Sequence, residues 1–506
     1  MTRWAVLTGR GFTGPGGGRW NTVPVPMEWR GTSVQVCGQW PLVAGSARPR
    51  SGVPLGRDLA NQNGTSVCCD PISYFEDGLI ANPSALILGK PGLGKSSIAV
   101  RILLGLSARG VTPMVPGDLK PDYADVIAGL GGQIIRVGRG LGQINVLDPG
   151  AMAEAADTIG GTAGARLRQE ATDRALEMVA ALIAIVRRQP VTDHEELLLA
   201  AALNHLMTHT APQIPTLPDL ATLLEEGPEP LRIATLARGD ETVYREVADP
   251  VQKSLQAVIR GPLGATFAGQ TTTAIPLSSH GVCVDISAIG ERDERLTAAV
   301  MLAAWADAFG AMEAAAALAD AGHAPLRTFL VVLDEMWRAL RLGAGLPDRM
   351  DAITRINRTL GLGQLMLTHT LADLESMASE ADQRKARGFA ERAGMVLCAG
   401  LPRRELDELS RVVRLSEPEI DMVSSWSTPP SWAPRRGDGG RPATPPGAGK
   451  VLIKVGGRAG IPVKVELTDT ELRLHDTNSR WHTTSPGVPA GEPAPPAARP
   501  GPGTPW

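Results

Sequence analysis

At 506 residues, the chain is long enough for roughly two to four domains around a well-buried main core. Its 50 Lys and Arg and 53 Asp and Glu give a formal net charge of -3, which excludes a basic electrostatic field over the whole protein. A local basic channel is compatible with this net charge, because net charge does not describe how the charges are distributed. Only eight of the 50 are lysines, and the five cysteines are odd in number and lack metal-ligand spacing. These cysteines favour a reduced, intracellular protein over a disulfide scaffold or a zinc module.

Residues 1–80 mix Trp, Gly and Pro with short β-branched runs such as "TSVQVCGQW", which predicts a small strand-rich N-terminal module. Over residues 81–150, apolar runs alternate with helical segments. We expect strands at "SALILG", "TPMVPGD" and "GQIIRVG", and a helix over residues 95–110 that ends at Gly110. This alternation predicts an α/β fold with a parallel sheet and helices on both faces.

Residues 151–260 carry amphipathic helical patterns with few strand signals, so we expect an all-helical insertion into the sheet domain. The sheet resumes over residues 261–426 with the strand-length runs "GVCVDIS", "RTFLVVLDE", "LGQLMLTHT" and "AGMVLCAG". Residues 427–449 are rich in Pro and Gly and predict a flexible linker. Residues 450–483 predict a β-hairpin that turns near "GGRAG", and residues 484–506 are too rich in Pro to pack, which predicts a disordered tail.

The longest apolar stretch, "LTAAVMLAAWADAFGAMEAAAALA", is interrupted by Asp307 and Glu313. It therefore predicts a buried Ala-rich helix rather than a membrane span. The first residues have no apolar h-region, so no signal peptide is expected. A role at a membrane would then require docking through partner proteins.

The stretch "ALILGKPGLGKSSIAV" contains the P-loop pattern G-x-x-x-x-G-K-[ST]. Its glycines let backbone N–H groups face a phosphate, and the helix that follows offers its N-terminus to the anion. Lys95 would reach the β- and γ-phosphates, Ser96 would bind Mg²⁺, and Ser97 lies where it can contact an α-phosphate. The alternative, a Gly-rich turn that binds nothing, is disfavoured by the flanking strand and helix. The phosphate-binding residues are Gly89, Lys90, Pro91, Gly92, Leu93, Gly94, Lys95, Ser96 and Ser97.

The second half of such a site is an apolar strand that ends in acidic residues, and "FLVVLDE" supplies one. Asp334 would hold Mg²⁺, and Glu335 would polarise the attacking water as a general base. Such a strand can also be purely structural, but its pairing with a P-loop makes the functional reading stronger. The direct Asp-Glu adjacency favours a RecA-like ATPase over a small GTPase or a nucleotide kinase.

Three further segments are candidates for the same site. His369 ends the strand "LGQLMLTHT" and would sense the γ-phosphate if the strands are neighbours; the alternative is a histidine that merely ends a strand. The helical stretch with Arg349, Arg355 and Arg358 is either a solvated face or a source of an arginine for a neighbouring subunit's site, with Arg355 and Arg358 preferred. "GDLKPDY" is an acid–base cluster at a strand's carboxyl end, where ligands bind, or else a surface turn.

Six segments together resemble the actinobacterial branch of the TraC/TrbE-like conjugative-transfer ATPases, the type IV secretion class within the FtsK–HerA superfamily of P-loop motors. They are the P-loop, "GDLKPDYADV", "GQINVLDPG", "LVVLDEMWRAL", "LGQLMLTHTLADL" and "KVLIKVGGRAGIPVKVELT". The resemblance covers roughly residues 30–482, and "DEMWRAL" is its most specific segment after the P-loop. "GDLKPDY" is similar to the D-x-K-G-E-Y-like segment of that superfamily.

The resemblance implies a RecA-like motor domain that commonly works as a hexamer and powers a membrane-spanning conjugation channel. It implies ATP and Mg²⁺ as ligands, with Lys95 and Ser96 for phosphate and Mg²⁺, Asp334 for Mg²⁺ and Glu335 for water activation. His369 falls near the position where the family usually has Gln, and the N-terminal region is short for the family. The implied location is cytoplasmic, peripheral at the inner face of the membrane through channel subunits.

The leading prediction is therefore an ATPase motor for conjugative DNA or protein transfer. The first alternative is an FtsK/HerA-like translocase acting on double-stranded DNA, although the sequence has no recognisable winged-helix or zinc module for DNA. The second alternative is a nucleotide-gated scaffold that binds ATP without significant turnover.

Overall fold

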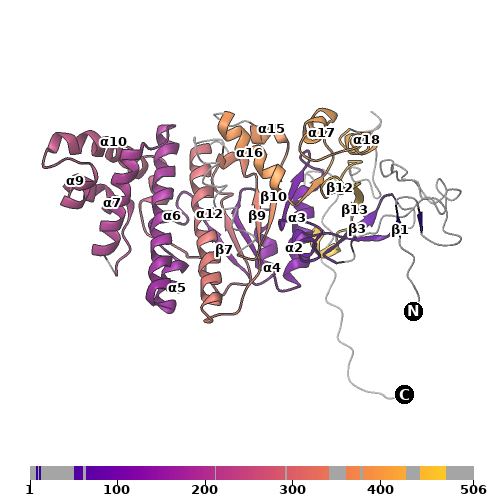
Figure 1. Ribbon diagram of the computed structural model, residues 1–506, viewed down its shortest axis with the longest axis horizontal. Coiled ribbons are helices and arrows are strands. Elements are labelled where there is room, and N and C mark those ends of the chain that lie inside the picture. The colour runs from indigo at the N-terminus through magenta and orange to yellow at the C-terminus, as the bar shows by residue number, and fades with distance from the viewer. Residues whose placement is uncertain are drawn as a thin grey trace, which may run out of the picture.

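A computed structural model describes the fold over residues 7–8, 11–12, 49, 51–60, 64–210, 212–290, 293–340, 360–375, 380–428 and 445–474. An eleven-stranded mixed sheet forms the centre of this described part (Figure 1). Its order is β4-β3-β13-β12-β11-β5-β10-β9-β6-β8-β7. A separate antiparallel pair joins β1 (Leu7–Thr8) to β2 (Gly11–Phe12).

One side of the large sheet is parallel, as the alternation of apolar runs and helices predicts. The predicted strands at the P-loop and at the Asp-Glu pair are confirmed, and β10 lies between them, paired with both. The parallel strands are β11 (Met395–Cys398), β5 (Ser84–Leu88), β10 (Leu362–Thr368), β9 (Phe329–Asp334), β6 (Thr112–Asp118), β8 (Val282–Asp285) and β7 (Gln133–Arg136).

Strand β5 is buried over its whole length because both faces of the sheet are covered. Leu86 and Leu88 point into one hydrophobic core, which extends into the helical region. Ala85 and Ile87 point into the other core, beneath the helix that follows the P-loop. The alternation along the strand therefore contributes to both cores at once.

The antiparallel side of the sheet combines segments from the two ends of the described chain. The predicted C-terminal hairpin is confirmed: β12 (Lys450–Lys454) pairs with β13 (Ile461–Val465). This hairpin joins the main sheet, because β12 pairs with β11 and β13 pairs with β3 (Pro54–Asp58). β4 (Ser66–Cys68) completes the edge, so these early strands extend the central sheet rather than forming a sheet of their own.

Helices cover the sheet. Those that connect its strands are α2 (Pro71–Glu76), α3 (Lys95–Ser107), α4 (Ala124–Gly129), α12 (Glu294–Asp320), α13 (Trp337–Leu340), α15 (Leu371–Glu375), α16 (Glu380–Arg392), α17 (Arg403–Leu409) and α18 (Glu417–Trp426). A last helix, α19 (Asp469–Leu474), follows the hairpin. Helix α3 begins where predicted, and Gly110 adopts a φ of 87° just past its end, in the region that favours glycine.

Between β7 and β8 the chain is helical, as expected for the insertion, and it extends to one end of the molecule in Figure 1. The helices of the insertion are α5 (Ala151–Ile159), α6 (Gly161–Arg187), α7 (Asp193–Thr210), α8 (Leu217–Glu226), α9 (Glu229–Ala234), α10 (Glu241–Arg260) and α11 (Gly264–Phe267). Helices α5 and α6 pack against α12, and α7, α9 and α10 lie farther from the sheet.

Helix α12 is the predicted Ala-rich apolar helix. Among the described helices it alone is long and apolar enough to cross a membrane, and 89% of its apolar window is buried inside the protein. Its small side chains allow close packing: a Cβ at Gly310 would lie 3.3 Å from the Met152 sulfur. The helix is therefore a core element, as predicted.

Some predictions concern residues outside the described part of the chain. These are most of residues 1–50, the middle of the 427–449 segment, the 484–506 tail, and Arg349, Arg355 and Arg358. The described cysteines are all free, and no cluster of metal-binding side chains occurs among the described residues.

Candidate nucleotide site

The P-loop connects the carboxyl end of β5 to the N-terminus of α3. Gly92 and Gly94 adopt φ angles of 77° and 95°, in the region that favours glycine. Gly94 caps α3 without a side chain, and a Cβ at Gly92 would meet nothing within 4 Å. No side chain caps the first N–H groups of α3, which leaves them available to a phosphate anion.

Lys95 is the first residue of α3 and its side chain is buried. Its Nζ donates to the carbonyl oxygen of Gly89 at 2.8 Å and to Nδ1 of His369 at 2.7 Å. Burial lowers the pKa of Lys95, while the charges of Glu335 and Asp334 oppose this shift. Because an ammonium group has no acceptor, His369 accepts at Nδ1 and carries its proton on Nε2.

Glu335 follows β9 directly, with a φ of 52° that is uncommon for a residue other than glycine. One carboxylate oxygen lies 2.8 Å from Nε2 of His369 and 3.2 Å from Nζ of Lys120. The other accepts a hydrogen bond from the indole N–H of Trp337 at 2.7 Å. Burial opposes the charge, but the hydrogen bonds of His369 and Trp337 and the charge of Lys120 outweigh it and lower the pKa of Glu335 to about 2.

Asp334 occupies the last position of β9 and accepts a hydrogen bond from the Tyr123 hydroxyl at 3.0 Å. Burial, reinforced by the negative charge of Glu335, raises the pKa of Asp334 to about 6. Two adjacent carboxylates therefore have pKa values shifted in opposite directions. A bound divalent cation would relieve the cost of keeping Asp334 ionised.

The segment "GDLKPDY" belongs to this site. The Asp118 carboxylate accepts hydrogen bonds from the backbone N–H groups of Asp122, Tyr123 and Ala124 at 3.1, 2.8 and 3.1 Å. The turn held in this way brings Lys120 to Glu335 and Tyr123 to Asp334. Asp118 and Tyr123 are buried, so the surface-turn alternative is wrong for them.

Sequence reasoning found this segment but assigned no role to Lys120 or Tyr123. The available signal was an acid–base cluster at the carboxyl end of a strand. The missing information was the strand order, since β6 pairs directly with β9. That pairing places the ends of two strands, far apart in sequence, side by side.

Strand order also decides the position of His369. β10 pairs with β5 on one side and with β9 on the other. His369 follows β10 and therefore lies between the P-loop and the Asp-Glu pair. The condition attached to its predicted role, that these strands are neighbours, is met.

The residues present suit a nucleotide and Mg²⁺. The uncapped N–H groups at the start of α3 and the ammonium of Lys95 fit phosphate oxygens. The Ser96 hydroxyl and the Asp334 carboxylate are hard oxygen ligands of the kind that Mg²⁺ prefers. The structure brings together the predicted Lys95, Asp334, Glu335 and His369, whereas Arg355 and Arg358 lie outside the described residues.

The strand order, the P-loop and the Asp-Glu strand define a RecA-like P-loop NTPase fold. A solved structure of VirB4 from Thermoanaerobacter pseudethanolicus matches 85% of this chain and 100% of its own, with a TM-score of 0.58 and 19% identity. The plasmid coupling protein TrwB in complex with ADP and Mg²⁺ matches 76% of this chain and 85% of its own, at a TM-score of 0.48 and 13% identity. The predicted fold class is confirmed, because the chain shares its fold with this VirB4 structure.

The cytoplasmic domain of the type VII secretion ATPase EccC from Thermomonospora curvata also matches, with a TM-score of 0.30 and 15% identity. The match covers 83% of this chain and 29% of the EccC chain. No protein-family model matches the sequence. No curated protein matches it either.

Proposed function

We propose that this chain is an ATP-hydrolysing motor that powers conjugative transfer of DNA or protein through a type IV secretion-like channel. One observation carries the hydrolytic part: His369 joins the P-loop Lys95 at 2.7 Å to Glu335 at 2.8 Å. A carboxylate base is thus held next to the phosphate-binding lysine. The VirB4 fold and the sequence resemblance support the transport part.

In this proposal the P-loop N–H groups and Lys95 bind the β- and γ-phosphates of ATP, and Ser97 contacts the α-phosphate. Ser96 and Asp334 hold Mg²⁺, which neutralises phosphate charge when it is bound. Glu335 accepts a proton from the attacking water as the water oxygen bonds to the γ-phosphorus and the bond to ADP breaks.

The contacts of Glu335 set a condition for that step. Both of its carboxylate oxygens already accept hydrogen bonds, from His369, Lys120 and Trp337. These three donors occupy three of the roughly four acceptor positions of the carboxylate, so one position is left for the attacking water. His369 and Lys120 share one oxygen, so the open position is on the oxygen that Trp337 contacts, and water can bind there while His369 still holds the carboxylate.

We further propose a homo-oligomer, hexameric by family resemblance, in which Arg355 or Arg358 reaches a neighbouring subunit's site. The motor domain spans residues 81–150 and 261–426, with residues 151–260 inserted. Channel subunits would hold it at the cytoplasmic face of the membrane.

Mg²⁺-dependent release of phosphate from ATP tests the site. We expect Lys95→Ala to lose turnover by at least about a hundredfold because phosphate binding is lost. Glu335→Gln should lose turnover equally but retain bound ATP in an oligomeric protein. Lys253→Ala and Glu246→Gln, at exposed positions of α10, are matched controls that should behave like the parental chain.

The outcomes separate the competing functions. Parental turnover in both site variants would overturn the site assignment. ATP binding without measurable turnover in the parental chain would favour the nucleotide-gated scaffold. Strong stimulation of turnover by double-stranded DNA would instead favour the DNA translocase.

A further inference from the structure

Lysine is rare in this chain, which has eight lysines among its 50 cationic residues, yet several lie near the P-loop end of the sheet. Lys120 is paired with Glu335 at 3.2 Å, and Lys454 of β12 is paired with Glu419 at 3.2 Å. Three others have no carboxylate within 4.0 Å in the described part of the chain. These three are Lys90, Lys450 and Lys464.

Lys450 and Lys464 face each other directly in the antiparallel pair β12–β13. Since Cys398 pairs with Leu452, Lys450 lies beyond the end of β11, at the edge where the parallel strands end and ligands bind. Like charges directly opposite in a ladder destabilise the pair. The side chain of Lys464 is exposed at the surface, but partial desolvation and the charge of Lys450 lower its pKa. An anion at this position would stabilise both ammonium groups.

This lysine pair is connected to the P-loop through the backbone just before β12. The N–H of Gly449 donates to the P-loop carbonyl of Leu93 at 3.0 Å, and a Cβ at Gly94 would lie 3.5 Å from the Gly449 nitrogen. The Lys464 ammonium donates to the carbonyl of Ala448 at 2.5 Å. It therefore stands against a segment in contact with the N-cap of α3.

The strand order fixes which end of a bound nucleotide lies on this side. Lys95 contacts His369 at the end of β10, and Glu335 follows β9, so hydrolysis takes place on the β10–β9 side of the P-loop. β11, β12 and β13 lie on the opposite side of β5. The part of the nucleotide nearest the ribose must extend toward them.

We propose that Lys464, assisted by Lys450, binds the α-phosphate of the nucleotide, so that the C-terminal hairpin forms the second wall of the nucleotide site. This inference rests on the proposed nucleotide binding. It adds a lysine pair that contributes to affinity and takes no part in hydrolysis. In this proposal, the contact between the hairpin and the P-loop places the lysine pair at the nucleotide.

Calorimetric titration of the full chain with ADP in the presence of Mg²⁺ tests the proposal, because ADP has the α-phosphate and is not hydrolysed. Lys464→Met keeps the aliphatic stem and removes the charge, and should weaken ADP binding about tenfold. Lys450→Met should weaken it by a smaller factor. Lys464→Arg should restore most of the affinity, and the exposed Lys253→Met is the matched control.

Turnover measurements give a second, independent readout. KM for ATP should rise about tenfold in Lys464→Met, with kcat within about twofold of the parental value. The unfolding temperature without nucleotide should not fall, because a like-charge contact is removed.

Three results would overturn the inference. The first is a Lys450→Met/Lys464→Met double variant that binds ADP within twofold of the parental affinity, while Lys95→Ala loses binding. This result would overturn the inference and leave the proposed function intact. The second is a loss of ADP affinity in Lys464→Met that is accompanied by a lower unfolding temperature, with no loss of affinity in Lys450→Met. This result would assign Lys464 a structural role. Failure of the parental chain to bind ADP or ATP would overturn both proposals.

Discussion

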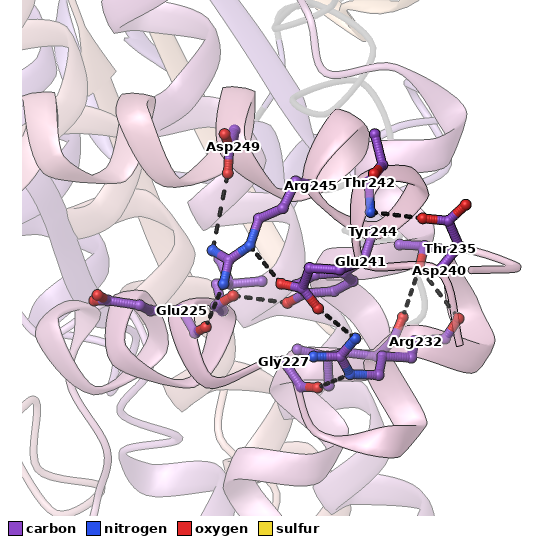
Figure 2. Close-up of polar contacts among 12 residues, drawn as sticks. Glu225, Gly227, Arg232, Thr235, Asp240, Glu241, Thr242, Tyr244, Arg245 and Asp249 are labelled. Atoms are coloured by element: carbon purple, nitrogen blue, oxygen red, sulfur yellow. Dashed lines mark hydrogen bonds and ion pairs between the residues drawn. The ribbon is translucent and has the colours of Figure 1, made fainter. Parts of the chain in front are cut away.

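Two polar networks in this protein are both centred on carboxylates, but they differ in how far apart in sequence the contacting residues lie. In the helical insertion, Glu241 accepts hydrogen bonds from Arg232 and Arg245, which lie nine and four positions away (Figure 2). Arg245 also donates to the carbonyl of Glu225, 20 positions away, and the Tyr244 hydroxyl donates to Leu224. The network closes α8, α9 and α10 onto one another, using neighbours in sequence.

In the nucleotide site the partners are distant in sequence. Lys95 and His369 are 274 positions apart, Lys120 and Glu335 are 215 apart, and Tyr123 and Asp334 are 211 apart. These contacts exist only because the strands that carry them are adjacent in the sheet. Their carboxylates are buried, whereas the side chain of Glu241 is 53% exposed. Exposed ion pairs contribute little to the stability of the fold, whereas buried ion pairs strongly influence the protonation of the groups that they contact.

The largest expected effect follows from removing the residue that joins the two halves of the site. His369→Ala separates Lys95 from Glu335, and we expect turnover of ATP to fall about a hundredfold because the base is no longer held by this contact. Steady-state phosphate release measures the effect. His323→Ala, at an exposed position after α12, is the control and should leave turnover unchanged. A His369→Ala chain with parental turnover would mean that the bridge is not used in catalysis.

An effect of intermediate size is expected in the pH dependence of stability, through Asp118. Burial raises the pKa of Asp118 from 3.8 to about 7, although backbone hydrogen bonds from Tyr123 and Asp122 oppose this shift. Between these two pH values the folded chain binds a proton that the unfolded chain has lost, so this group makes folding less favourable as pH rises. Asp118→Asn cannot ionise. We therefore expect its free energy of unfolding, relative to the parental chain, to rise with pH by at most about 1.4 kcal/mol per unit in this window.

Urea unfolding at several pH values between 4 and 7 measures that difference. A difference that stays constant with pH would show that Asp118 does not titrate in this range. The loss of the accepting carboxylate adds an offset that does not change the slope.

The smallest expected effect is in the network of the insertion. Glu241→Gln removes a charge that is exposed and paired with two arginines, so we expect turnover within twofold of the parental value. The unfolding temperature should shift by less than about 2 °C. Thermal unfolding and phosphate release on the same sample measure both. A large loss of turnover here would indicate that the insertion is coupled to the site.

The comparison also explains what could be predicted. The P-loop, the Asp-Glu strand and the hairpin near "GGRAG" follow from local patterns, because strand burial, turns and phosphate cradles depend on neighbouring residues. The roles of Lys120 and Tyr123 could not be predicted, since their partners belong to a strand more than 200 positions away. The sequence predicts the role of His369 only on the condition that the strands are neighbours, which the strand order meets.

The sequence by itself determined that this chain has a phosphate-binding loop, an acidic strand end and a helical region between two parts of a sheet. Tertiary structure alone decided that β10 separates β5 from β9, which makes His369 the link between Lys95 and Glu335. It also decided that the hairpin extends the sheet beside the P-loop, with Lys464 near the N-cap of α3. The physical reason is that local backbone preferences specify strands and turns, whereas the order of strands depends on how the two cores pack across the whole chain.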